Sequence, residues 1–257
     1  MASMKNSQSG LYWTPKGGNN HEGMFASCHK YTSVTKDQDS GQNSETTILI
    51  DMGQNEFPEK FADGKYDKVV PALTDCLAIP GQKAPETPAS AIFLTHCHSD
   101  HIDAVFEYVQ MGVKLPPIYG TEYTLKALRA EFYSRGIDIP EKLEMKKVEA
   151  GQTIEIGNMK VRALAASHSI PGCLSFEISN GEASIFHSGD TKSDETSSLG
   201  KGVDLKSYRD IAGVDFAVWD AANADRDGHS TSEAEACEEY REIFKENADK
   251  QIVVAMP

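Results

Sequence analysis

The sequence predicts an α/β fold in which two β-sheets pack together under outer helices. Apolar runs of strand length fall into two groups, with two segments of helical periodicity between them and a third near the end. The second group contains Asn180-Gly181, a strong signal for a hairpin turn. Ser232 and Glu235 have the spacing of a capping box, which predicts where the last helix begins. The prediction of two packed layers rests on this order of strands and helices.

The N-terminal part of the chain contains one clear strand. Its first 45 residues are rich in Gly, Asn, Ser, Lys and Gln, which predicts loops with one or two short strands around residues 24–34. Residues 46–50 are mostly β-branched and apolar, so they predict a strand that ends at Asp51. Residues 52–89 show little periodicity and contain several prolines, and we expect mostly loop there.

The rest of the chain alternates between helical and extended patterns. A buried strand is expected at residues 91–95. Two helices should follow, over about residues 100–111 and 121–135, because apolar residues recur there at three- and four-residue intervals. The strands expected beyond this point are 146–149, 153–156, 160–165, 174–178, 183–186, 214–219 and 251–255. A helix from about Ser232 to Asn247 precedes the last of these strands.

The motif THCHSDH, which begins at residue 95 directly after the apolar run at residues 91–94, is the most informative part of the sequence. Its potential metal ligands are His96, His98, Asp100 and His101. Because successive side chains of an extended segment point to opposite sides, His96 and His98 can face the same point. Asp100 and His101 lie past the strand end, where the chain turns, and can reach a second ion. The spacing therefore predicts a site for two metal ions.

Two later strand ends also carry potential ligands. His168 follows a predicted apolar strand, and Asp190 follows the hairpin, after Gly189, which allows a tight approach of the backbone. Each residue alone has an ordinary explanation, since a histidine after a strand is often capped or faces solvent. Three strand ends that offer ligands can converge at one edge of a sheet, and we expect them to do so here.

Composition limits the cellular setting. The chain has 257 residues, enough for one large or two small domains. It has no apolar run near the ~20 residues of a membrane span and no apolar region of a signal peptide, so no membrane partner is expected. Five scattered cysteines argue against a disulfide framework or a thiolate zinc site and favour a reducing cytoplasm. Cys97 alternates with two histidines and should pack on the opposite face.

The charge balance argues mildly against a nucleic-acid partner. With 25 basic and 39 acidic residues the net charge is −14, and a broad basic surface is not expected. RNA and DNA are not excluded as substrates, because metal ions in a cleft can supply the positive charge that a phosphate needs.

The spacing H-x-H-x-D-H, followed by a lone histidine and then by S-G-D, resembles the metallo-β-lactamase superfamily. The resemblance implies a four-layer αβ/βα sandwich and two metal ions, usually zinc, with Mn²⁺ or Mg²⁺ as alternatives. The ligands that it implies are His96, His98 and His168 for the first ion, Asp100 and His101 for the second, and Asp190 as a bridge between them. Asp51 matches the superfamily's first motif, a carboxylate that orients ligands. A strand-ending Asp in a turn is the alternative interpretation.

Three further segments resemble ribonuclease J, which belongs to the β-CASP group of enzymes that cut RNA and DNA. Residues 14–24 resemble its opening P-x-G-G…E-I-G, and residues 168–171 match its H-S-I-P. Residues 219–233 resemble its S-D-S-T-N-A…G-x-x-x-S-E, with Ala221-Ala222 in place of Ser-Thr. By this resemblance Asp220 is an additional acidic residue near the metals.

The resemblance also implies a domain boundary. β-CASP enzymes carry a second domain inserted into the first. We therefore expect a metallo-β-lactamase-like domain over residues 1–222 and the start of a β-CASP-like domain, one helix and one strand, over residues 223–257. The superfamily's last metal ligand, a distant histidine, has no candidate here. The first domain is thus expected to be truncated before its C-terminal strands; a short, complete domain with altered closure is the alternative.

One segment resembles a different branch of the superfamily. His229, in the sequence GHST, resembles the H-S-T loop of ribonuclease Z, a tRNA 3′-processing endonuclease. That enzyme would continue into a strand that ends in a histidine, whereas here the expected strand ends without one. Ribonuclease J therefore remains the preferred branch, and His229 is interpreted as a loop residue.

Together these features predict a zinc-dependent hydrolase, most specifically an RNA phosphodiesterase. Asp100 and Asp190 would position the attacking nucleophile, with Asp220 as a third catalytic carboxylate. A small-molecule hydrolase acting on thioesters or lactones and a non-catalytic metal-binding scaffold are the alternatives. The sequence leaves open whether the enzyme acts as an exonuclease or an endonuclease, and whether it forms a homo-oligomer.

Overall fold

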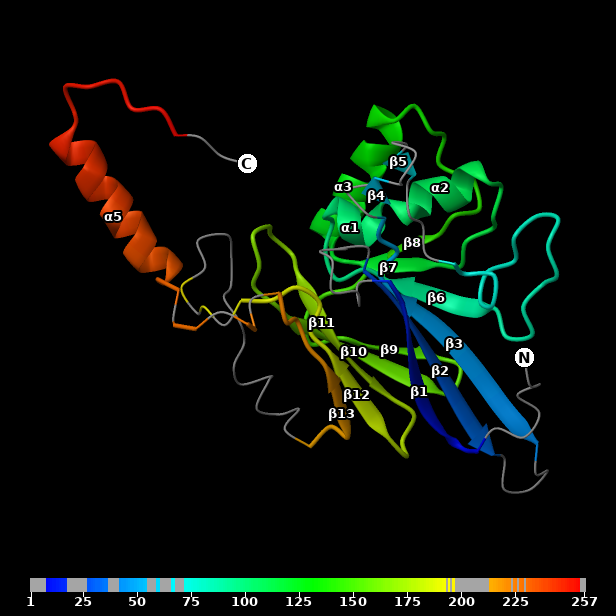
Figure 1. The fold of residues 1–257 in the computed structure, drawn as a ribbon. Helices are drawn as coiled ribbons and strands as arrows, with labels where there is room; N and C mark the ends of the chain where they lie inside the picture. The colour runs from blue at the N-terminus through cyan, green and yellow to red at the C-terminus, as the bar shows by residue number, and fades with distance from the viewer. Residues whose placement is uncertain are drawn as a thin grey trace.

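Two β-sheets face each other, and the helices α1 to α3 lie against the outer face of the first sheet (Figure 1). The structure is a computed structural model, and it describes residues 8–17, 27–36, 42–54, 59–60, 66–67, 72–192, 194, 196, 213–222, 224–225, 227–228 and 230–254. The helix α5 extends away from the two sheets (Figure 1). The predicted α/β fold with two packed sheets is confirmed.

The first sheet has six strands in the order β1-β2-β3-β6-β7-β8. Its strands are β1 Gly10–Gly17, β2 Cys28–Lys36, β3 Asn43–Ile50, β6 Ala89–Phe93, β7 Ile118–Gly120 and β8 Met145–Lys147. The first three strands pair antiparallel, whereas β3, β6, β7 and β8 are parallel neighbours. Parallel neighbours need crossover connections. Two of these carry helices, which are α1 Ser99–Ile102 and α2 Ala104–Gln110 in one and α3 Glu122–Ser134 in the other.

The second sheet has five strands in the order β13-β12-β11-β10-β9. Its strands are β9 Thr153–Ile156, β10 Met159–Ala165, β11 Leu174–Ser179, β12 Ser184–His187 and β13 Phe216–Val218. The predicted hairpin at Asn180-Gly181 joins β11 to β12, and Gly181 has the positive φ, 86°, that such a turn requires. The short strands β4 Glu59–Lys60 and β5 Tyr66–Asp67 form a separate pair.

Apolar cores lie on both faces of the first sheet. On β3, Ile48 and Ile50 face the second sheet, whereas Leu49 faces the helices. In the core between the sheets, Phe93 and Phe176 pack with their ring centroids 5.4 Å apart. Burial on both faces explains why the central strands read as continuous apolar runs in the sequence.

The N-terminal strands are longer than the sequence predicts. Where we expected loops and short strands around residues 24–34, β1 and β2 are extended strands that pair along their length. The polar residues Lys30 and Thr32 are buried in β2, which lies between two strands. Pairing of β2 along both edges, with the preceding strand β1 and the following strand β3, forms this part of the sheet despite its low local hydrophobicity.

Two other predicted elements differ from the structure. The helix expected at residues 100–111 is divided at Asp103, because the amide of Ala104 donates to the carbonyl of Met52 at 2.9 Å instead of to the preceding turn. The strand expected at residues 251–255 is absent from residues 251–254, which pair with none of the described strands. Residue 255 lies outside the described part of the chain.

The last helix begins as the sequence predicts. α5 spans Glu233–Glu246, and Ser232 and Glu235 exchange the two hydrogen bonds of a capping box. None of its residues is buried, and Tyr240 and Phe244 remain exposed. Among the described helices, none is both long and apolar enough to cross a membrane.

A cluster of buried polar side chains lies where β1, β2 and β12 meet between the sheets. The indole of Trp13 donates to Nδ1 of His29 at 3.2 Å, and Tyr31 Oη lies 2.9 Å from Nδ1 of His187. The two imidazole centroids are 4.7 Å apart. Burial lowers the pKa of His29 to about 4 and lowers the pKa of His187 well below its usual range. Both histidines are therefore neutral in the folded protein at neutral pH.

We expect this cluster to make the fold acid-sensitive. Below pH 6.5 the unfolded state binds a proton at His29, whereas the folded state does so only near pH 4. The free energy of unfolding should therefore fall by about 2 kcal/mol between about pH 7.5 and about pH 5 from this residue alone. His29→Asn keeps an acceptor for Trp13 but does not titrate, so it should remove about this part of the pH dependence. Urea unfolding of the chelated protein measures it, and an unchanged pH dependence would contradict the assignment.

Candidate metal centre

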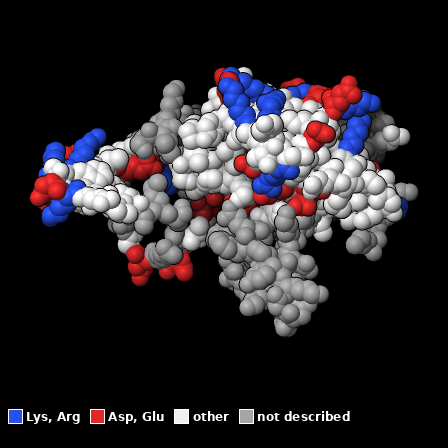
Figure 2. Space-filling view, turned by 90° about the horizontal axis from the view of Figure 1, so that it is seen from above, with Lys and Arg blue, Asp and Glu red and all other residues white. Residues whose placement is uncertain are grey.

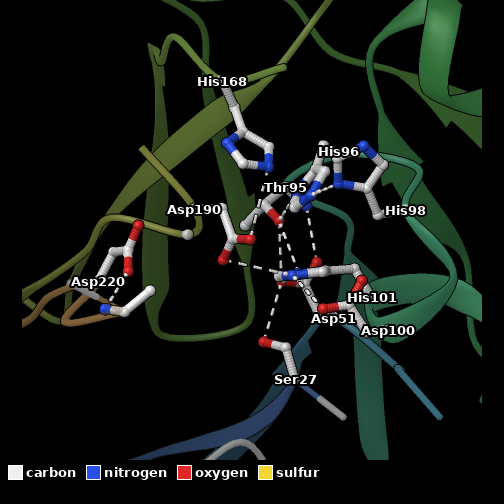
Figure 3. A network of polar contacts seen from close by, with 12 residues as sticks. Ser27, Asp51, Thr95, His96, His98, Asp100, His101, His168, Asp190 and Asp220 are labelled. Atoms are coloured by element: carbon white, nitrogen blue, oxygen red, sulfur yellow. Dashed lines mark hydrogen bonds and ion pairs between the residues drawn. The ribbon is translucent and has the colours of Figure 1, made fainter. Parts of the chain in front are cut away.

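The ends of four strands from both sheets bring the predicted site residues together. β3 ends before Asp51, and β6 ends before the motif at residues 95–101. From the second sheet, β10 leads to His168 and β12 leads to Asp190. Figure 3 shows these side chains pointing toward one another across the space between the strand ends. The predicted convergence at one edge is therefore present in the structure.

Two groups of donor atoms lie close enough to hold a metal ion. The first group is His96, His98 and His168, and the second is His96, His101 and Asp190. Within each group the donor atoms all lie within 4.8 Å of one another. His96 belongs to both groups, whereas the resemblance to the superfamily assigns it to the first ion only.

Asp190 lies between the two groups. Its Oδ1 is 3.4 Å from Nε2 of His101, and its Oδ2 is 3.6 Å from Nε2 of His168. Burial acts to raise the pKa of Asp190, but the hydrogen bond to His101 and the neighbouring histidines hold it below its usual range. A carboxylate with one oxygen toward each group has the geometry expected of a bridge.

Asp51 supports the site by hydrogen bonds to Thr95 and His101. Its side chain is fully buried, and its φ of 59° is the positive value of a strained turn at the end of β3. Oδ1 accepts the backbone amide of Thr95 at 2.8 Å, and Oδ2 lies 2.8 Å from both Thr95 Oγ1 and Nδ1 of His101. Ser27 Oγ adds a longer contact at 3.4 Å. These bonds fix the ring of His101 so that Nε2 faces Asp190.

Two of the predicted site carboxylates lie at the border of the cluster. Oδ2 of Asp100 is 3.6 Å from Nε2 of His101, but Asp100 joins neither donor group among the described residues. Asp220 accepts the amides of Thr191 at 3.2 Å and Ala222 at 2.9 Å, so it lies against the loop that carries Asp190 (Figure 3). Asp220 is thus placed to support this loop, outside the donor groups.

Two hydroxyl groups contact the histidines, and the sequence alone does not indicate either contact. Thr95 Oγ1 lies 3.0 Å from Nδ1 of His96, and Ser169 Oγ lies 3.4 Å from Nε2 of His98. Thr95 belongs to the motif THCHSDH and Ser169 to the segment at residues 168–171, but no pattern in the sequence reveals contacts formed only by folding. The expectation for Cys97 is confirmed, because it packs against the helix-side core.

The donor set fits divalent metal ions. Nε2 of His96 and Nδ1 of His98 face each other at 2.9 Å, with the carboxylate of Asp190 nearby. Burial lowers the pKa of His96 well below 6.5, and burial also lowers the pKa of His168, so both are neutral as coordination requires. Imidazole and carboxylate donors without thiolate suit zinc in a catalytic site, and manganese as well.

Comparison with known proteins identifies the family. A family model described as "Beta-lactamase superfamily domain" matches residues 46–249. The chain belongs to the metallo-β-lactamase superfamily. A protein of unknown function from Enterococcus faecalis has a crystal structure that matches 85% of this chain and 54% of its own, with a TM-score of 0.58 and 17% identity, and so shares the fold of this metallo-β-lactamase domain.

Several relatives of this metallo-β-lactamase chain are ribonucleases. It is 33% identical to ribonuclease J of Thermus thermophilus over 203 residues, which are 77% of this chain and 34% of that protein. It is 31% identical to ribonuclease J2 of Bacillus subtilis over 168 residues, which are 65% of this chain and 29% of that protein. The chain thus spans about a third or less of these curated relatives, and it is similar to them over its metallo-β-lactamase part.

Removing the shared donor should empty the site. The purified protein is expected to bind about two divalent ions per chain. His96→Ala combined with His98→Ala should abolish this binding, because His96 belongs to both donor groups. Cys97→Ala, a change between the two histidines on the opposite face, is the matched control and should retain the metal. Metal analysis after gel filtration measures the ratio, and full retention in the double variant would contradict the assignment.

Gly189 should be required for the approach of Asp190. A Cβ at Gly189 would lie 2.8 Å from Thr95 Cγ2, so Gly189→Ala should displace the Asp190 loop and weaken zinc binding about tenfold or more. Gly181→Ala is the matched control, since Gly181 also has a positive φ but no atom within 4 Å of its Cβ position. Both changes strain the backbone by roughly 1–2 kcal/mol. Equal zinc affinities in calorimetry would refute the role of the close contact.

Proposed function

We propose that this chain is a ribonuclease J-like phosphodiesterase that acts on RNA through a dinuclear zinc site. The proposal rests chiefly on the two donor groups that share His96, with Asp190 reaching toward both. The proposed ligands are His96, His98 and His168 for the first ion, Asp100 and His101 for the second, and Asp190 as the bridge. Asp100 lies outside both donor groups, and its inclusion is supported by its carboxylate oxygen 3.6 Å from Nε2 of His101. The likeness to proteins named ribonuclease J supports RNA as the substrate class.

When bound, the two ions would lower the pKa of an attacking water and neutralise charge on the phosphodiester. The side chains of the protein would hold these participants in place. Asp190, between the two groups, would orient the nucleophile, and Asp100 beside His101 would assist it. Asp51 would keep Nε2 of His101 directed at the site through its 2.8 Å contact with Nδ1.

The metals are central to this proposal because the protein surface offers RNA little positive charge. On the face shown in Figure 2, Lys and Arg occur in separate groups with acidic side chains among them. Several basic side chains of the described residues are paired with acidic ones, such as Lys126 with Glu122 and Lys147 with Glu149, both at 2.7 Å. The net charge of −14 has the same consequence. Attraction of a phosphate would therefore come from the ions in the site.

We further propose that Asp220 is an acidic residue that acts near the metals by holding the Asp190 loop, and that residues 1–222 and 223–257 belong to different domains. The contact between Asp220 and Thr191 supports the first part. The exposed helix α5, which buries none of its residues, supports the second. A cytoplasmic location fits the five cysteines, all of which are free.

A substrate panel separates this proposal from its rivals. The zinc-loaded chain should cleave 5′-monophosphorylated RNA and should not hydrolyse thioesters or lactones. His96→Ala with His98→Ala should abolish cleavage, whereas His229→Ala should retain it, since His229 is the residue that a ribonuclease Z mechanism would require. Thioester or lactone turnover without RNA cleavage would refute the proposal, and loss of RNA cleavage in His229→Ala would favour the ribonuclease Z branch.

A further inference from the structure

Thr95 occupies a central position that the proposed ligand set does not explain. It is 1% exposed and lies between the end of β6 and His96. Its hydroxyl contacts three groups at once, which are Asp51 Oδ2 at 2.8 Å, Nδ1 of His96 at 3.0 Å and Nδ1 of His101 at 3.3 Å. A threonine hydroxyl has one proton to donate and two lone pairs that accept. These three contacts therefore limit where the protons can lie.

The Asp51 carboxylate accepts the one hydrogen bond that the Thr95 hydroxyl can donate. A carboxylate only accepts hydrogen bonds, and its contact with the hydroxyl is the shortest of the three. His101 has a closer acceptor than Thr95, because its Nδ1 lies 2.8 Å from the same carboxylate. The hydroxyl oxygen is then left to accept a hydrogen bond from Nδ1 of His96.

We propose that Thr95 is a positioning residue that fixes the proton of His96 on Nδ1 and thereby leaves the lone pair of Nε2 free for a metal ion. A neutral imidazole carries one proton, so a donor at Nδ1 makes Nε2 the acceptor. Nε2 of His96 is also the atom that faces His98 at 2.9 Å. Asp51 thus orients His101 directly and His96 through Thr95.

The methyl group of the same side chain has a separate effect. Thr95 Cγ2 lies 2.8 Å from where a Cβ at Gly189 would be, so it limits how closely the Asp190 loop can approach. Two substitutions separate these effects. Thr95→Val keeps the branched shape and removes the hydroxyl, whereas Thr95→Ser keeps the hydroxyl and removes the methyl group.

Two measurements without substrate test the proposal. Long-range ¹H–¹⁵N spectra of the metal-free protein should show His96 with its proton on Nδ1 in the wild type and in Thr95→Ser, and a shift toward the Nε2-protonated form in Thr95→Val. Zinc affinity by competition with a chelator should fall about 10- to 100-fold in Thr95→Val and stay within about threefold of wild type in Thr95→Ser.

The outcomes are decisive in either direction. A wild-type spectrum with the proton of His96 on Nε2 would overturn the proposal, even if Thr95→Val failed to fold. Wild-type zinc affinity together with an unchanged His96 tautomer in a folded Thr95→Val protein would overturn it as well. The inference rests on the proposed metal site but not on its substrate. Failure to cleave RNA would therefore count against the proposed function and leave this inference standing.

Discussion

The buried carboxylate of Asp51 is the constraint on which the centre depends. A carboxylate removed from water is costly unless hydrogen-bond donors surround it. Here the backbone and hydroxyl of Thr95 and the ring of His101 provide those donors at 2.8 Å. The same contacts tie the end of β3 to the segment after β6 and hold two histidine rings in position. Stability of this corner and orientation of the site thus come from one set of bonds.

The centre lies across the junction of the two sheets. His96 and His101 follow β6 of the first sheet, whereas His168 and Asp190 follow strands of the second. The amide of Leu174 donates to the carbonyl of Thr95 at 2.8 Å and joins the sheets at this point. Because the donor groups draw on both sheets, their spacing depends on how the core between the sheets packs. A shift of one sheet against the other would move Asp190 relative to the histidines.

The Asp190 loop also connects the centre to α5. The amide of Lys192 donates to the carbonyl of Ser167, next to His168, at 2.7 Å. Farther along, Asp194 accepts the amide of Glu233 at the start of α5 at 2.6 Å, and Lys192 Nζ lies 3.2 Å from the Glu233 carboxylate. A carboxylate at this position also interacts favourably with the positive end of the helix dipole. A hydrogen bond and an ion pair therefore connect the start of the proposed second domain to the segment that follows Asp190.

The α/β class, most of the strands and the identity of the candidate ligands could be predicted from the amino-acid sequence. These features depend on local spacing: alternation within THCHSDH, three- and four-residue periods in helices, and the capping box at Ser232. The folded chain was needed to reveal that His96 is shared by two donor groups, that Asp100 lies outside both, and that Thr95 links Asp51 to His96. The same holds for the long, buried strand β2 and for the division of the helix after the motif by the carbonyl of Met52. These outcomes depend on pairing and contacts between separate segments of the chain, which local patterns do not encode.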